Sequence, residues 1–167
     1  MHIGNRDWLN DVQDRYASDM GDLLEIGSLN VNGSAREHLR PRTWVGVDCV
    51  HGEDVDVHCD AEATAFEPEI FNVLLSTSMA EHNPRWREGI SHNLKWLKPS
   101  GLLLLSWGAE GNLHHLPEPW APVPVGDVLE WCVKERLLIL EACWERTKYT
   151  PDCEGCYDII ARKAATT

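Results

Sequence analysis

A short stretch near the start of the chain has the residue types of a turn that binds a nucleoside. The apolar run Leu23–Ile26 contains an acid near its end, a glycine turn follows from Gly27, and Gly33-Ser34 leads into a helix start. A second apolar run, Trp44–Asp48, also ends in an acid. Glycines at such a turn let the backbone approach a ligand, and an acid after the next strand accepts hydrogen bonds from ribose hydroxyls. The two runs predict a nucleoside-binding β–α–β unit with one acid at the turn and one at the ribose.

The details of this turn discriminate between nucleoside cofactors. In a dinucleotide-binding turn the second glycine lets the backbone approach the pyrophosphate, but that position here is Leu29. Glu25 would repel a pyrophosphate, whereas a carboxylate suits the sulfonium and ammonium groups of S-adenosylmethionine. Asp48 can bond both ribose hydroxyls, and a helix that opens after Gly33 would offer free N–H groups to the methionine carboxylate. The residues therefore favour S-adenosylmethionine over NAD or FAD.

Alternating apolar runs and helix signals extend this unit into an α/β domain. We expect strands over residues 22–26, 43–48, 54–58, 71–76, 101–106, 137–144 and 157–161. We expect helices over residues 7–20, from about 35, from about 84 to 98, and over 125–133. Strands that alternate with helices form a mostly parallel sheet with helices on both faces, and the last two strands, with no helix between them, should pair as an antiparallel edge hairpin.

Five motifs carry a resemblance to a known family. They are Glu25–Ser34, Val45–Asp48, Val55–Ala61, Phe71–His82 and Leu97–Leu103. Their succession is similar to that of class I S-adenosylmethionine-dependent methyltransferases, and within them most resembles the small type-11 methyltransferase-domain proteins. The resemblance runs from about residue 22 to 120. It implies a Rossmann-like three-layer sandwich whose seven-stranded, mostly parallel sheet has a reversed C-terminal hairpin strand. We expect one domain over residues 1–167, with its cofactor half at about 22–78.

The resemblance also implies how the methionine and ribose parts of the cofactor are held. Glu25 would hold the methionine end, directly or through water. Gly27, Ser28 and Gly33 belong to the turn that approaches the cofactor backbone, and Asp48 would bind the ribose.

Four more residues are assigned by resemblance to the adenine and methionine surroundings. Asp60 would meet the adenine amino group, and the Ala61 N–H a ring nitrogen. Ser76 and Thr77 would lie under the methionine moiety. The segment after Asp60 is short, so the adenine wall should be thin.

Methyl transfer needs a positioned acceptor, and a base where the acceptor carries a proton. His82 follows the fourth strand and can titrate near neutral pH, so it is the candidate general base, with Glu81 as a weaker candidate. The proline-rich residues 108–124 predict a long loop over the acceptor side of the sheet. His114, His115 and Trp120 in this loop are candidates for lining the acceptor pocket.

The absence of two motifs and the negative net charge reduce the range of possible methyl acceptors. Ser76–Met79 stands where base-modifying amino methyltransferases have Asp/Asn-Pro-Pro-Tyr or cytosine methyltransferases have Pro-Cys. The chain has 15 Lys and Arg against 27 Asp and Glu, a net charge of −12, which repels phosphate backbones. A small-molecule acceptor, such as a sugar or another metabolite hydroxyl, is the remaining interpretation. The alternatives are a catalytically idle module that binds S-adenosylmethionine and regulates or scaffolds a partner, a nicotinamide oxidoreductase, and a nucleic-acid methyltransferase.

The composition predicts the cellular location of the protein and the state of its cysteines. No apolar run approaches the roughly 20 residues of a membrane span, and the first residues lack the apolar stretch of a signal peptide. We therefore expect a soluble cytoplasmic protein with reduced thiols and no membrane partner. Cys153–Cys156 has the spacing of half a zinc site, and strand alternation would scatter Cys49, His51, His58 and Cys59 over two faces, so we expect no metal. The sequence does not determine the oligomeric state.

Overall fold

The computed structural model describes residues 3–108, 123–145 and 155–165, and it places all seven strands in one sheet. The strand order is β3-β2-β1-β4-β5-β7-β6. The strands are β1 (Asp22–Ile26), β2 (Thr43–Asp48), β3 (Val57–His58), β4 (Phe71–Thr77), β5 (Leu97–Gly108), β6 (Leu137–Glu145) and β7 (Cys156–Lys163). In the sheet, neighbouring strands among β3, β2, β1, β4 and β5 are parallel. Strand β7 is antiparallel to both β5 and β6. The predicted seven-stranded sheet with a reversed C-terminal hairpin strand is confirmed.

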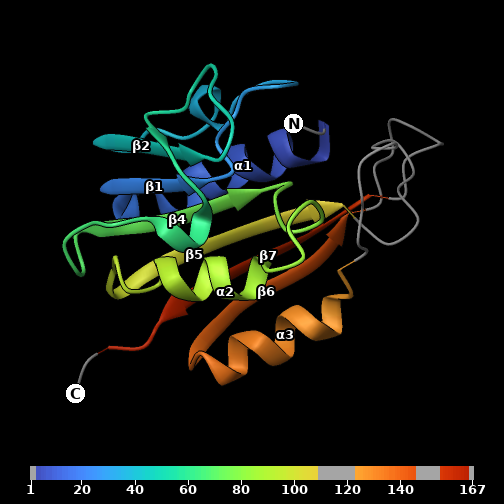
Figure 1. Ribbon diagram of the computed structural model, residues 1–167. Helices are drawn as coiled ribbons and strands as arrows, with labels where there is room; N and C mark the ends of the chain where they lie inside the picture. The colour runs from blue at the N-terminus through green and yellow to red at the C-terminus, as the bar shows by residue number, and fades with distance from the viewer. Residues whose placement is uncertain (1–2, 109–122, 146–154, 166–167) are drawn as a thin grey trace.

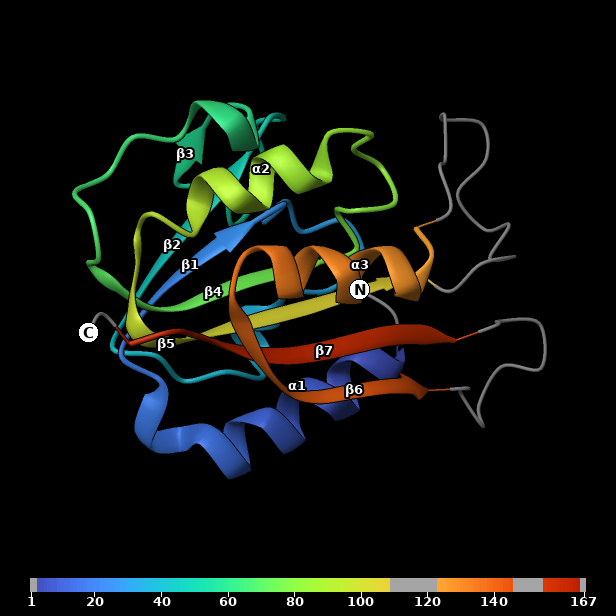
Figure 2. The ribbon, with the colours of Figure 1, turned by 90° about the horizontal axis from the view of Figure 1, so that it is seen from below.

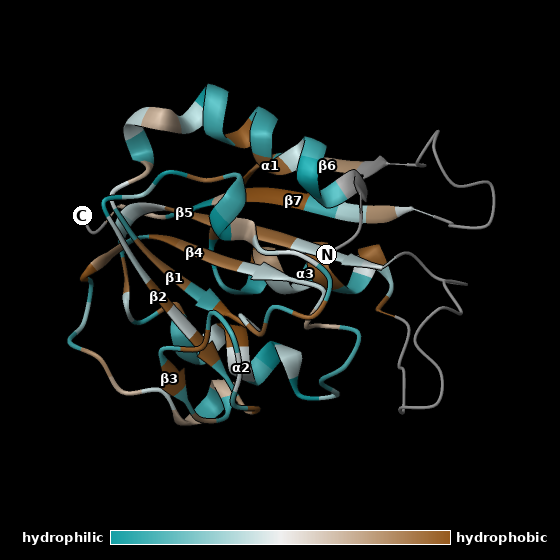
Figure 3. Ribbon diagram, turned by 90° about the horizontal axis from the view of Figure 1, so that it is seen from above, coloured by the Kyte–Doolittle hydropathy of each residue, from teal (hydrophilic) through white to brown (hydrophobic). Residues whose placement is uncertain are grey.

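Within the described ranges, three α-helices complete the two outer layers (Figure 1). They are α1 (Ile3–Tyr16), α2 (Trp86–Asn93) and α3 (Val125–Lys134). Helix α1 packs on one face of the sheet, and α2 and α3 pack on the other (Figure 2). The apolar run of β5 serves both cores, since Leu102 and Leu104 pack on the α1 side and Leu103 and Leu105 on the α2–α3 side. Figure 3 shows this apolar interior along β5 and β7 and the polar outer surface of α1.

Tertiary contacts shift the bounds of two predicted helices. The first helix begins at Ile3, because the polar residue Asn5 is fully buried and its amide accepts a hydrogen bond from the Ser106 hydroxyl. It ends at Tyr16 and continues as the 3-10 turn η1 (Ala17–Asp19). The helix expected after Asn83-Pro84 begins only at Trp86 and ends at Asn93, so Leu97 belongs to β5 and not to that helix.

The connections on the β3 side of the sheet are shorter than predicted. Strand β3 spans two residues instead of 54–58, because Asp54 has a left-handed φ of +66° and the Asp56 carboxylate accepts the Gly46 N–H. Residues 27–42, all of which the structure describes, contain only one 3-10 turn, η2 (Ala35–Glu37), which Ser34 caps. The expected helix start near Ala35 is therefore confirmed, but the helix is a single 3-10 turn and not an α-helix. A further 3-10 turn, η3 (Ala61–Ala63), follows β3.

No helix among the residues that the structure describes is long and apolar enough to cross a membrane.

Candidate functional site

The carboxyl ends of the parallel strands meet at one edge of the sheet and bring most of the predicted site residues together. Ile26 pairs with Val47 across β1 and β2, and Thr77 pairs with Ser106 across β4 and β5. The chain order reverses between β1 and β4, which are neighbours in the sheet. In open parallel sheets ligands bind outside the carboxyl ends of the strands at such a reversal. The candidate site therefore lies beyond the ends of β1, β2 and β4.

The turn after β1 is folded onto the end of β2. Gly27 has a φ of +80°, which favours glycine, and the N–H groups of Gly27 and Ser28 both donate to the Val47 carbonyl, at 2.9 and 3.1 Å. The Leu29 N–H donates to Asp48 Oδ2 at 3.1 Å. The Ser28 hydroxyl is buried and has no hydrogen-bond partner in the described part of the chain. Gly27, Ser28 and Asp48 are thus brought to one place, as predicted.

Asp48 keeps acceptor capacity for a ligand. Its Oδ1 accepts the Val50 N–H at 2.9 Å, and its Oδ2 accepts the Leu29 N–H. Each carboxylate oxygen has a second lone pair. The two oxygens can therefore hold the backbone of both loops and still accept two ribose hydroxyls.

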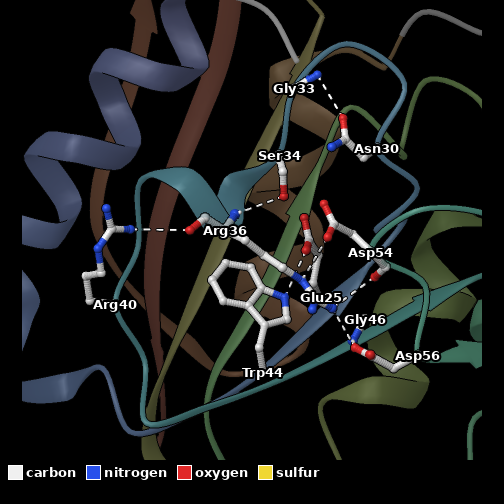
Figure 4. Close-up of polar contacts among 10 residues, drawn as sticks. All are labelled: Glu25, Asn30, Gly33, Ser34, Arg36, Arg40, Trp44, Gly46, Asp54 and Asp56. Atoms are coloured by element: carbon white, nitrogen blue, oxygen red, sulfur yellow. Dashed lines mark hydrogen bonds and ion pairs between the residues drawn. The ribbon is translucent and has the colours of Figure 1, made fainter.

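The loop between the turn and η2 is held by its own side chains. Asn30 Oδ1 accepts the Gly33 N–H at 3.0 Å, and Gly33 has a φ of +108° (Figure 4). A Cβ at Gly33 would lie 3.2 Å from the Arg6 guanidinium, so α1 reaches this loop. Sequence reasoning included Gly33 but missed Asn30, although an asparagine three residues before a glycine is a usual turn signal.

Glu25 lies buried beneath this loop with few polar partners. It is 3% exposed, and its Oε2 accepts the Trp44 indole N–H at 3.0 Å (Figure 4). The Arg36 guanidinium stacks over the Trp44 ring at 5.5 Å and binds the Asp54 carbonyl and the Asp56 carboxylate. Neither residue could be assigned from the sequence, since the pairing of β1 with β2 places Trp44 beside Glu25 and the contact with the Trp44 ring places Arg36.

Burial is the main reason that Glu25 is a weak acid here. It raises the pKa of Glu25 to about 8, against the opposing effects of the Trp44 hydrogen bond and the Arg36 charge. The nearby carboxylates of Asp54 and Asp48 raise this pKa further. A carboxyl in this state becomes ionised when a cation arrives beside it. The site therefore suits a positively charged group.

The end of β4 lies against the same turn. Ser76 is buried and its hydroxyl donates to the Ile26 carbonyl at 2.9 Å, so it fastens β4 to the end of β1. Thr77 is half-buried beside it. Met79 covers the turn, because a Cβ at Gly27 would lie 2.7 Å from the Met79 Cβ. Position 27 therefore requires glycine for both its φ and this close contact.

The predicted adenine residues follow β3. The Cys59 N–H donates to the Asp48 carbonyl at 3.0 Å, which places the segment beside the end of β2. Asp60 precedes η3 and its side chain is exposed, while Ala61 is half-buried in the first position of η3. The structure thus brings Asp60 and Ala61 to the same edge as Asp48.

Of the two candidate bases, Glu81 and not His82 points inward. Glu81 is 2% exposed and its Oε1 accepts the Gly108 N–H at 3.1 Å, whereas His82 is exposed. No described residue gives Glu81 Oε2 a hydrogen bond. Burial raises the pKa of Glu81 to about 7, and the N–H bond from Gly108 only partly offsets it.

The remaining candidates cannot be placed. His114, His115, Trp120 and Cys153 lie outside the described residues. Within the described ranges, no group of three or more His, Cys, Asp or Glu side chains is arranged to hold a metal ion.

We expect Glu81→Gln to flatten the pH dependence of stability. The folded protein holds the Glu81 proton up to a pKa of about 7, whereas the unfolded chain releases it near the ordinary value of 4.5. The free energy of unfolding therefore falls as pH rises from about 4.5 to 7, by roughly 3 kcal/mol from this group. Urea unfolding at pH 5 and pH 8 should show a smaller fall for Glu81→Gln than for the wild type. The exposed control Glu37→Gln should show the same fall as the wild type. If the free energy of unfolding of Glu81→Gln falls as much as that of the wild type, the raised pKa of Glu81 is contradicted.

No protein-family model and no curated protein sequence matches the chain. Solved structures do match. The chain is similar to the N-methyltransferase NodS from Bradyrhizobium japonicum WM9, with a TM-score of 0.71 and 15% identity over 96% of each chain. It is similar to the 1,6-didemethyltoxoflavin-N1-methyltransferase of Burkholderia thailandensis, solved with 1,6-didemethyltoxoflavin and S-adenosylhomocysteine, with a TM-score of 0.70 and 12% identity over 93% of this chain and 76% of that chain.

A third similar structure is the [4+2]-cyclase SpnF, with a TM-score of 0.71 and 16% identity over 96% of this chain and 81% of that chain. The resemblance to the type-11 group in particular stays a prediction, since no family model matches. The chain has the fold of the class I S-adenosylmethionine-dependent methyltransferases.

Proposed function

We propose that this protein binds S-adenosylmethionine at the carboxyl ends of β1, β2, β3 and β4 and transfers its methyl group to a small molecule. One observation carries the proposal. A buried carboxyl, Glu25, lies beneath a glycine turn whose backbone is bonded to Asp48 at the next strand end. A cationic nucleoside without phosphate matches this pair of acids, whereas a pyrophosphate would be repelled by them.

The binding roles follow from the strand order. Glu25 would pair with the ammonium group of the methionine part, directly or through water. The unpartnered Ser28 hydroxyl and the backbone around Gly27 would contact the cofactor beside it, with Gly33 closing the loop. Asp48 would accept the ribose hydroxyls.

The remaining assignments lie on either side of these residues. Asp60 and Ala61 would face adenine, and Ser76 and Thr77 would underlie the methionine part. The bound cofactor supplies an electrophilic methyl group on a sulfonium, and the protein supplies position, which accounts for much of the catalysis in such a displacement. His82 is the proposed base where the acceptor must lose a proton, and its exposed position leaves it accessible to an acceptor.

Charge and similar structures support a small acceptor. The net charge of −12 disfavours a nucleic acid. The similar Burkholderia enzyme was solved with the small molecule 1,6-didemethyltoxoflavin, and SpnF shows that a protein of this fold can carry a different activity. The second candidate function is therefore a module that binds S-adenosylmethionine without methyl transfer.

We expect S-adenosylhomocysteine, but not NADH, to raise the melting temperature. Asp48→Ala removes the proposed ribose acceptor and should weaken S-adenosylhomocysteine binding more than about tenfold, the usual cost of losing hydrogen bonds to a charged group. Asp22→Ala is the matched control, because Asp22 is a strand-end acid at the opposite edge, paired with Arg42. It should lower the melting temperature and keep the ligand-induced shift. Equal shifts with NADH, or none with S-adenosylhomocysteine, would contradict the proposed cofactor.

We expect the affinity for S-adenosylhomocysteine to rise between pH 6 and pH 8. Glu25 has a pKa of about 8 in the free protein and must lose its proton to pair with the ligand ammonium. Affinity should therefore increase with pH, by at most about tenfold per pH unit. Calorimetric titration should show this rise in the wild type and a nearly flat profile in Glu25→Gln. A rise of the same size in Glu25→Gln would exclude Glu25 as the ammonium partner.

A radiolabelled methyl-donor assay against metabolite pools, RNA and DNA separates methyl transfer from idle binding. We expect label in the small-molecule fraction. His82→Gln should lower turnover and leave the affinity for S-adenosylhomocysteine within about twofold, because a base acts only on the acceptor proton. Unchanged turnover in His82→Gln would reject the base assignment, and cofactor binding with no labelled product would favour the second candidate function.

A further inference from the structure

The turn η3 lies next to the place where we expect the base of a bound nucleoside. This inference rests on the proposed function. Glu25 at the end of β1 takes the methionine part and Asp48 at the end of β2 takes the ribose, and β3 is the next strand outward. The base attached to that ribose therefore extends toward the end of β3. The segment there is Asp60 followed by η3.

The Asp60 carboxylate has the chemistry to distinguish adenine from a related base. It is exposed and makes no capping hydrogen bond to η3. A carboxylate accepts a hydrogen bond from the 6-amino group of adenine. Hypoxanthine has a carbonyl oxygen at the same position, which would be repelled. Discrimination between the two bases depends on holding Asp60 and Ala61 in place.

Asn93 of α2 holds both ends of η3. The side chain is fully buried, and its Nδ2 donates to the Ala61 carbonyl and to the Gly89 carbonyl, both at 2.8 Å. Its Oδ1 accepts the Thr64 hydroxyl at 2.8 Å. One amide thus binds the first residue of the turn through its donor and the residue after the turn through its acceptor.

Other contacts from the same region support this clamp. The Trp96 indole N–H donates to the Thr64 hydroxyl at 3.1 Å, and the His92 imidazole contacts the Thr64 carbonyl at 2.7 Å. Gly89, one helical turn before Asn93, permits the close approach, because a Cβ there would lie 3.0 Å from the Ala61 Cβ. Within the short turn itself, the Ala63 N–H donates to the Asp60 carbonyl at 2.9 Å. Helix α2 therefore contacts η3 at both ends.

We infer that Asn93 is a positioning residue for base recognition: through Ala61 and Thr64 it fixes the segment that selects adenine over hypoxanthine. It acts through Asp60 and Ala61 and does not touch the ligand itself. The role is distinct from stabilising the fold, because it affects the ratio of two affinities and not only the amount of folded protein.

Calorimetric titration with S-adenosylhomocysteine and S-inosylhomocysteine tests this inference. These two ligands differ at the 6-position of the base, which carries an amino group or a carbonyl oxygen, and at the adjacent ring nitrogen N1, which carries a proton only in hypoxanthine. The wild type should prefer S-adenosylhomocysteine by more than about tenfold, because a polar group left facing the wrong partner is costly. Asn93→Leu, which fills similar space without an amide, should reduce this preference to about threefold or less. Its affinity for S-inosylhomocysteine should stay within about threefold of the wild type, since the methionine and ribose contacts are unchanged.

Asn72→Leu is the matched control. Asn72 is a half-buried amide near the start of β4, where its Oδ1 accepts hydrogen bonds from the Asp22 N–H and from Lys98. The same substitution there should lower stability and keep the wild-type preference for adenine. Circular dichroism establishes that each variant is folded at the titration temperature.

The outcomes separate this inference from the proposed function. A wild type that binds neither ligand contradicts the proposed function, and with it the inference. A wild type that binds both ligands equally, or a folded Asn93→Leu that keeps the full preference or loses both affinities in proportion, overturns the inference alone. If Asn93→Leu does not fold, Gly89→Ala decides. Its added methyl displaces Ala61 by a few tenths of an ångström and should also reduce the preference, and an unchanged ratio there overturns the inference.

Discussion

The hydrogen bonds that fold the β1 turn onto the end of β2 organise the candidate site. The Val47 carbonyl takes two N–H groups of the turn and Asp48 takes a third, so the chain leaving β1 must run across β2. This path requires glycine at position 46, where a Cβ would lie 2.2 Å from the Asp54 carbonyl and 2.7 Å from the Ser28 hydroxyl. The acid of the first strand is thereby enclosed, and the acid of the second is fixed beside the turn.

Enclosing Glu25 has an electrostatic cost that the fold does not remove. Its environment offers one indole N–H, while Asp48 and Asp54 add negative charge and Arg36 is engaged by Asp54 and Asp56. An apolar side chain at this position would stabilise the folded protein more than a buried carboxyl does. A carboxyl kept in such surroundings at the end of a strand is expected where a ligand brings the missing positive charge. The same argument applies to the Ser28 hydroxyl, which is buried without a partner among the described residues.

The strands could be predicted from the sequence because continuous apolar runs show where a sheet is covered on both faces. The bounds of β1 and β2 match the prediction, and the reversed hairpin followed from the absence of a helix between the last two strands. Two of the errors lie where a side chain makes a tertiary contact. Buried Asn5 lengthened α1 at its start, and the Asp56 carboxylate took the place of a strand bond and shortened β3.

The residues of the candidate site also divide into those that could be predicted from the sequence and those that could not. The positions of Gly27 and Asp48 could be predicted because they depend on local chain geometry. Trp44, Arg36 and Asn93 could not, since their roles depend on the pairing of strands and on the packing of a helix far along the chain.

The single turns η2 and η3 explain why side chains carry so much of the site. Where a longer helix would fix a loop through its own backbone bonds, each turn here has three residues and depends on distant partners. On the β2 side, η2 contributes Arg36, which binds the distant Asp54 carbonyl and Asp56 carboxylate and so joins the turn to the segment before β3. On the β3 side, the distant partner is Asn93, which binds η3 at both ends. Local backbone order in this half of the molecule is therefore coupled to individual polar side chains, and under the proposed function ligand recognition at the strand ends would depend on residues that contact no ligand.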